Sequence, residues 1–226
     1  MKRREFIGSG LVASVAVSAS GQSKLMLPTD KPDEFHLKTM WYNPVPPIDQ
    51  AKWMLDIKGL VDRPQRLSVA DLRKLPQQQR SARMKCVQCW SGRNTWGGFL
   101  FAELLERAKP KGNARAIRID CADKWYEYMT LEEMRSPAVL MVLEMAGKPL
   151  PNNHGAPLRL LDASKYGYKS AKLITSITFV EQGQGSMACD LGPFYSPTGE
   201  ILAGYDHPLD LGGAKRKIAG GEIKDF

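Results

Sequence analysis

Most of the chain divides into short segments in which apolar and polar residues alternate, separated by turn residues at irregular intervals. The segments 53–59 and 115–121 alternate with a period of two, which predicts half-buried strands. The apolar runs 138–145, 158–161 and 173–180 predict further strands that are more deeply buried. We find no thirty-residue βαβ rhythm and no internal repeat. A mixed, loop-rich α+β fold is therefore expected.

Short helices are expected between these strands. The segments 68–71 and 130–133 have the spacing of capping boxes, in which two side chains satisfy the first backbone N–H groups of a helix. Residues 101–108 carry apolar side chains at helical spacing. The proline-rich segment 42–49 suits neither a helix nor a central strand. We expect it to run extended over the surface or along a groove.

The first twenty residues have the composition of an export signal. A basic start is followed by an uncharged stretch that is too short to span a bilayer comfortably. Arg3, Arg4 and Phe6 also resemble the twin-arginine signal, which directs folded proteins to export, although a general secretory signal is the alternative. A periplasmic location is expected. Three segments are predicted: a twin-arginine export signal (1–20), a polar linker (21–33) and one oxidoreductase domain (34–226).

The chain is basic, with a formal net charge of +8, of which +6 remains when the three cations and one acidic residue of the signal are removed. It has no long cationic run and no basic stripe interleaved with aromatic residues, so nucleic acid is not an expected partner. The charge favours a pocket for an anionic ligand or, more simply, scattered surface lysines and arginines.

The stretch RMKCVQCW places Cys86 and Cys89 three residues apart, among the cations Arg83, Lys85 and Arg93. A thioredoxin-like dithiol is one interpretation. That chemistry needs the first cysteine at a helix start, just after a buried strand, because the helix dipole lowers the pKa of a thiol. The preceding QQQRSARMK is polar and basic, which favours this interpretation only weakly.

Two metal sites and a plain structural role are the other interpretations of this stretch. Structural zinc needs a second ligand pair, and Cys121, Cys189 and three dispersed histidines do not supply finger-like spacing. A single thiolate among cations suits a redox-active transition metal, with Cys86 or Cys89 as the ligand. Two buried structural cysteines are the plain alternative.

A second basic region surrounds the turn Tyr166-Gly167-Tyr168. Lys165, Lys169 and Lys172 cluster there. Such a turn can direct backbone N–H and ammonium groups to an anion such as a phosphate. An ordinary solvated basic loop is the alternative interpretation.

Taken together, these stretches resemble the sulfite oxidase family of molybdopterin enzymes. The resemblance covers nearly the whole mature chain, through PVPPID, DIKGLVDRP, LSVADLRKLP, RMKCVQCWSGRNTWGGF, HGAPLRLLDASKYGYKSAKLITSI and YDHPLD. It implies the molybdopterin-binding fold of that family. It also implies a molybdenum–molybdopterin cofactor, in which the metal is bound by the dithiolene of one molybdopterin and by one protein cysteine.

The same resemblance implies the site residues. The family's RMxC position falls on Cys86, which is the inferred metal ligand and catalytic residue. Cys89 stands where the reductase-like members have a small residue, so its role is left open. The implied cofactor contacts are Asn43, Cys121 in the pterin pocket, His154, Arg159 against the pterin phosphate, Ser170, Ala171 and Lys172.

The activity implied is oxygen-atom transfer at a sulfur centre, with reduction of an S-oxide such as a methionine sulfoxide as the main hypothesis. Sulfite dehydrogenase-type oxidation is the alternative. Trp90 and Trp96 are expected either to wall a pocket for a neutral sulfoxide or to belong to the core, and His207 either to face the site or to anchor a turn. A disulfide exchanger and an inactive cofactor-binding protein are the hypotheses from other classes.

The resemblance also indicates the partners. The chain has no C-x-x-C-H haem-attachment motif, so electrons are expected to pass through a separate chain, either a membrane haem protein or a soluble cytochrome. The extra C-terminal domain with which sulfite oxidases commonly dimerise is missing from the sequence, which favours a monomer. The substrate is expected to be a small sulfur compound.

Overall fold

In the computed structural model, the structure describes residues 33–201 except 36, 88–90 and 193–194. The predicted signal, nearly all of the linker, Cys89, Trp90 and His207 lie outside the described residues. None of the helices in the described part is both long and apolar enough to cross a membrane.

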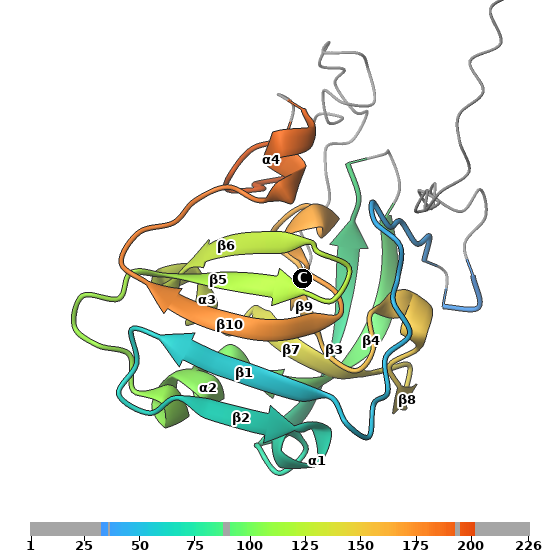
Figure 1. Ribbon diagram of the computed structural model, residues 1–226. Helices are drawn as coiled ribbons and strands as arrows, with labels where there is room; N and C mark the ends of the chain where they lie inside the picture. Colours follow the sequence, from blue (N-terminus) through green and yellow to red (C-terminus); the bar gives the residue numbers. More distant parts are fainter. Residues whose placement is uncertain (1–32, 36, 88–90, 193–194, 202–226) are drawn as a thin grey trace, which may run out of the picture.

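The first of two sheets has the strand order β2-β1-β10-β5-β6, and its strands run roughly horizontally in Figure 1. The parallel pair is β1 with β10, and the other pairs are antiparallel. Its strands are β1 (Met54–Gly59), β2 (Gln65–Ser68), β5 (Ala116–Cys121), β6 (Tyr126–Thr130) and β10 (Ile174–Val180).

The second sheet has the order β3-β4-β7-β8, with β9 also paired to β7, and its strands β3 and β4 stand steeply against the first sheet in Figure 1. The hairpin of β3 and β4 is in register from Gln77 opposite Phe99 to Lys85 opposite Ser91. Its strands are β3 (Gln77–Lys85), β4 (Ser91–Leu100), β7 (Val139–Met145), β8 (Lys148–Pro149) and β9 (Arg159–Asp162).

The strand β7 is the centre of the core, because it is buried on both faces. Its residues Val139, Met141 and Leu143 pack into the larger apolar cluster, which also contains buried residues of the first sheet. Leu140 and Val142 pack into a second cluster on the opposite face. A strand covered on both sides needs a continuous apolar run, which explains its sequence VLMVLEM.

Four short helices and two 3₁₀ turns connect the strands within the described residues. The predicted capping boxes at 68–71 and 130–133 are both present at the starts of α1 and α3. These elements are α1 (Val69–Leu72), α2 (Phe101–Ala108), α3 (Leu131–Met134), α4 (Met187–Leu191), η1 (Asn152–His154) and η2 (Gly167–Lys169).

The predicted mixed α+β fold is confirmed, and so are the strands read from alternation. The segment QQQRSARMK differs from its interpretation as a polar stretch without strand character, since it forms β3. Its first half is largely exposed and only Ala82, Met84 and Lys85 are buried near its end. A strand that is half exposed over most of its length carries polar residues on both faces, which hides it from an apolar pattern.

Candidate functional site

A cavity lies where the ends of β3 and β9 meet the loops that follow β5 and η2. Its empty volume is ≈ 810 Å³ with the open solvent at its mouth included, which is in the range of small-molecule sites. The residues that line it are Leu37, Lys38, Thr39, Met40, Trp41, Tyr42, Met84, Cys86, Val87, Asp123, Trp125, His154, Arg159, Gly167, Tyr168, Ser170, Ala171, Lys172 and Tyr195.

Cys86 reaches this cavity because it directly follows β3. Side chains alternate along a strand, so Met84 and Cys86 line the cavity whereas Arg83 and Lys85 do not. Arg93 stands opposite Arg83 on β4 and does not line it either.

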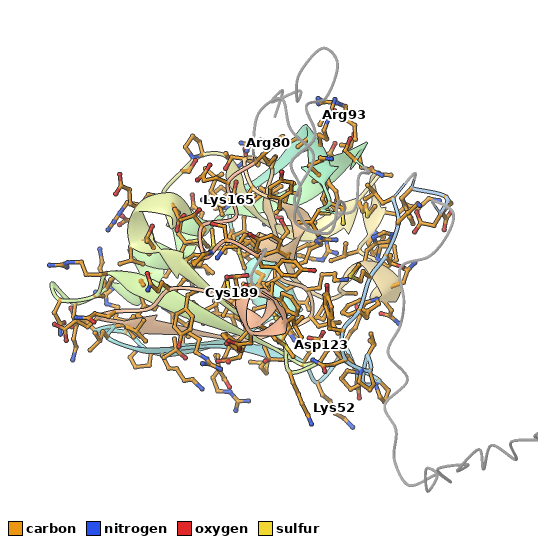
Figure 2. The ribbon with its side chains drawn as sticks, turned by 90° about the horizontal axis from the view of Figure 1, so that it is seen from above. Lys52, Arg80, Arg93, Asp123, Lys165 and Cys189 are labelled. Atoms are coloured by element: carbon orange, nitrogen blue, oxygen red, sulfur yellow. The ribbon has the colours of Figure 1, made fainter. Side chains whose placement is uncertain are left out.

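The sequence-based expectation that Arg83, Lys85 and Arg93 surround the thiol is therefore wrong. Figure 2 shows Arg80 and Arg93 toward one side of the molecule and Asp123, which lines the cavity, toward the other.

Arg159 is one of the cations that do line the cavity, and it is only 3% exposed. Its guanidinium donates to the backbone carbonyl of His154 at 3.1 Å and lies 5.1 Å from the centre of the Trp96 ring. Within the described residues no carboxylate pairs with it. Burial lowers the pKa of Arg159 to about 9, which shows how poorly its charge is compensated by the protein.

Lys172 is the second buried cation of the cavity. Its Nζ donates to the backbone carbonyl of Met40 at 2.5 Å and lies 3.6 Å from the centre of the Trp41 ring. Burial and the charge of Arg159 lower the pKa of Lys172 to about 7, against the smaller opposing effect of Asp123. An anion in the cavity would favour the charged form of both cations.

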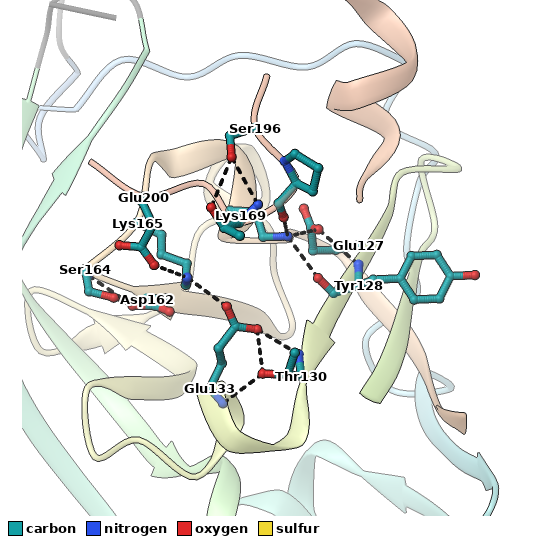
Figure 3. A network of polar contacts seen from close by, with 12 residues as sticks. Glu127, Tyr128, Thr130, Glu133, Asp162, Ser164, Lys165, Lys169, Ser196 and Glu200 are labelled. Carbon is teal, nitrogen blue, oxygen red and sulfur yellow. Dashed lines mark hydrogen bonds and ion pairs between the residues drawn. The ribbon is translucent and has the colours of Figure 1, made fainter. Parts of the chain in front are cut away.

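Lys165 and Lys169 do not join this pair, contrary to the prediction of an anion site around the turn. Figure 3 shows both lysines in a network of carboxylates. The Nζ of Lys165 lies 2.8 Å from carboxylates of Glu133 and Glu200, and Lys169 pairs with the buried Glu127. The solvated-loop alternative is wrong as well, because the two lysines are 4% and 1% exposed.

His154 enters the cavity from η1, where Gly155 follows with a positive φ of 102°. Its Nε2 lies 2.5 Å from the Asp33 carboxylate, which also accepts from the backbone N–H of Phe35 at 2.9 Å. Burial lowers the pKa of His154, against the hydrogen bond from Asp33. The imidazole therefore acts as a neutral, oriented group at the cavity wall.

Aromatic side chains from distant parts of the chain form another wall. The hydroxyl groups of Tyr42 and Tyr195 lie 2.7 Å apart, and the ring of Tyr42 stacks on Trp125 with centroids 5.5 Å apart. Tyr168 packs edge to face on Tyr195 at 5.1 Å. Sequence reasoning missed this wall, because its members are brought together only by the tertiary fold.

Six of the eight predicted contact residues line the cavity: Cys86, His154, Arg159, Ser170, Ala171 and Lys172. Asn43 does not, and its side-chain amide points to the sulfur of Met187 at 3.6 Å. Cys121 is 7% exposed, also does not line the cavity, and burial raises the pKa of its thiol well above the usual value. Trp96 belongs to the core, since it is fully buried.

The chemistry of the cavity fits an anionic ligand that carries a soft metal. It offers one thiol, two buried cations without a carboxylate partner in the described residues, and the Trp41 indole N–H, which has no acceptor there. A buried N–H without an acceptor costs free energy that a ligand oxygen or nitrogen would recover. A phosphate-bearing cofactor that ligates a metal meets all three features.

Residues 42–188 match the family model described as the oxidoreductase molybdopterin binding domain. The chain belongs to this family, which confirms the class predicted from the sequence and makes molybdenum-bound molybdopterin its cofactor. Among individual proteins, the chain is 34% identical over 186 residues to the protein-methionine-sulfoxide reductase catalytic subunit MsrP of Ralstonia nicotianae. That match covers 74% of this chain and 55% of the relative, so the chain spans about half the relative's length.

A solved structure shares the fold. The sulfane dehydrogenase SoxCD from Paracoccus pantotrophus aligns with a TM-score of 0.62 at 17% identity, over 80% of this chain and 48% of that chain. At this identity the likeness concerns the fold alone.

Proposed function

We propose that this protein is an exported molybdenum oxidoreductase that reduces an S-oxide of the methionine-sulfoxide kind. The observation that carries the proposal is the single cavity that joins the Cys86 thiol to two buried cations and an aromatic wall. The similarity to a methionine-sulfoxide reductase subunit supports the direction of the reaction.

The cofactor, when bound, supplies a metal that accepts an oxygen atom and exchanges electrons with a donor. In this proposal Cys86 is the protein ligand of the metal. Arg159 and Lys172 hold the cofactor phosphate, because they are the buried cations that the protein leaves without carboxylates. His154, Ser170 and Ala171 orient the cofactor from the same walls. Contact by Asn43 or Cys121, as the resemblance implies, requires these side chains to move toward the cavity.

Overall the reaction consumes one S-oxide, two protons and two electrons, and releases a sulfide and water. The sulfide product is uncharged, and the aromatic surfaces of Trp125, Tyr168 and Tyr195 suit an uncharged thioether or sulfoxide. Arg93 is absent from the cavity wall, which removes the cation that sequence reasoning placed near a sulfite ion.

Sulfite dehydrogenase-type oxidation is the second candidate. Lys38 lines the cavity, and an ammonium group at that wall would attract an anionic substrate. A disulfide exchanger is less well supported, because Cys86 follows a strand and no described helix begins at it. An inactive cofactor-binding protein predicts cofactor without turnover.

The proposal includes export by the twin-arginine route to the periplasm, which suits a cofactor inserted before export. It also includes a monomeric state and a separate electron donor, either a membrane haem protein or a soluble cytochrome.

A substrate screen with a dye as electron donor or acceptor tests the proposal. We expect methionine sulfoxide to be reduced and sulfite not to be oxidised, and we expect Cys86→Ser to lower the rate by at least about a thousandfold. Cys189→Ser is the matched control, because Cys189 is also partly buried but does not line the cavity. Turnover of sulfite alone would favour the second candidate, and full activity of Cys86→Ser would refute the role of Cys86.

A further inference from the structure

The segment Leu37–Asn43, called here the N-terminal wall, forms one side of the cavity. Every residue from Leu37 to Tyr42 lines it. The family match begins only at residue 42, so nearly all of this wall precedes the region that the chain shares with its family. What the wall does is therefore a property of this chain rather than of the shared domain.

Three contacts hold the wall against the rest of the cavity. Lys172 donates to the carbonyl of Met40 at 2.5 Å and lies over the Trp41 ring. The Tyr42 hydroxyl lies 2.7 Å from that of Tyr195. Each partner is itself a residue that lines the cavity, so the wall is attached to the groups that surround the ligand.

The wall has no regular secondary structure, apart from a single bridge residue at Trp41. Its backbone is therefore not fixed by pairing with a sheet over its length, and its position depends on these side-chain contacts. Two of them involve Lys172, whose own charge is poorly compensated inside the protein. An anion beside Lys172 would strengthen both.

Trp41 carries the feature that points to a ligand. Its side chain is 2% exposed, and its Nε1 has no hydrogen-bond acceptor within the described residues. Two other buried tryptophans satisfy theirs: Trp53 donates to the carbonyl of Ile174 at 3.1 Å, and Trp96 to that of Ala82 at 3.1 Å. Trp41 differs from them because it lines the cavity.

We propose that the N-terminal wall closes on the bound molybdopterin cofactor, and that the Trp41 indole N–H donates a hydrogen bond to an acceptor of that cofactor. The bound cofactor thereby orders the segment that follows the predicted export signal and linker. This inference rests on the cofactor of the family and is independent of which sulfur compound the enzyme reduces.

The test compares the full chain purified with its cofactor and from cells unable to make molybdopterin. Hydrogen exchange of the wall amides is measured in both forms, and release of the fluorescent pterin is timed in mild denaturant. Trp41→Phe keeps the ring under Lys172 and removes only the N–H. Trp53→Phe is the matched control, because it removes a buried indole N–H whose acceptor is a protein carbonyl.

We expect the wall amides to exchange at least about tenfold more slowly in the loaded protein, and Trp41→Phe to release the pterin about tenfold faster than the parent. Trp53→Phe is expected to destabilise both forms alike and to leave that release rate within about twofold. Equal exchange of the wall in the two forms would overturn the closure. Equal pterin release from Trp41→Phe and Trp53→Phe would overturn the hydrogen bond. Neither readout depends on turnover, so a wrong substrate would leave this result unchanged.

Discussion

Lys169 and Lys172 stand three residues apart around the same turn, and both are held inside the protein, yet their surroundings are opposite. Lys169 pairs with Glu127 and also donates to the carbonyls of Tyr128 and Pro197, at 2.9 and 2.8 Å. Lys172 faces the cavity, with one carbonyl and the face of one ring as its printed contacts. The first cation is satisfied by the protein itself, and the second is left for a ligand.

The difference shows how one turn serves both structure and binding. The carboxylate network around Lys165 and Lys169 joins η2 to β6, α3 and the segment near Glu200 (Figure 3). Tyr168 donates to the carbonyl of Ser196 at 2.7 Å, which ties the turn to the segment that brings Tyr195 into the cavity. We infer that the lysines of the network hold the turn in place, while Lys172 faces the ligand.

The largest effect is expected from Lys169→Met. It leaves the Glu127 carboxylate buried without its cation, and Glu127 Oε2 already has no partner within the described residues. We expect the free energy of unfolding to fall by about 3–5 kcal/mol, measured by urea unfolding of the cofactor-free protein. Adding Glu127→Gln should restore a good part of the loss. A loss below about 1 kcal/mol would show that the pair is not what holds the turn.

A smaller effect, of a different kind, is expected from Lys172→Met. Methionine replaces a buried cation without a carboxylate partner, so the cofactor-free protein should be as stable as the parent or slightly more stable. The affinity for the cofactor should fall by about tenfold or more, because a charge-assisted contact to the phosphate is lost. The pterin content after purification and dialysis measures this. Equal pterin retention in parent and variant would contradict the assignment of Lys172 to the ligand.

The smallest effect is a pH dependence of stability. The pKa of Lys172 falls from an ordinary value of 10.5 to about 7 in the folded protein. Between these values the unfolded chain binds more protons than the folded one, so this group makes the cofactor-free protein more stable as pH rises from about 7. A bound anion raises the pKa of Lys172, so the rise should shrink in the loaded protein. Urea midpoints at several pH values test this, and an unchanged slope in Lys172→Met would assign it to other groups.

The sequence predicted those elements whose signals are local. The capping boxes at 68–71 and 130–133 need only four consecutive residues, and the strands β1, β5 and β10 show regular alternation. The family, its cofactor and most of the cavity residues also followed from the sequence, because ordered motifs such as RMKC and KYGYKSAK carry them.

The errors arose where side-chain direction or distant partners decide the outcome. Proximity in sequence suggested that Arg83 and Lys85 surround Cys86, but alternation along β3 excludes them from the cavity. Composition likewise could not show that Lys169 meets Glu127, which lies 42 residues away. The role of Trp41 depends on a buried N–H without an acceptor, and no sequence pattern reveals such a group.

The central claim is that this cavity binds molybdopterin with Cys86 as the protein ligand of the metal. X-ray absorption at the molybdenum edge tests it most directly, because it counts the sulfur atoms bound to the metal. We predict three sulfur ligands in the parent and in Cys189→Ser, two from the dithiolene and one from the protein, and two in Cys86→Ser. A Cys86→Ser protein that retains molybdenum with the full set of sulfur ligands would contradict the claim.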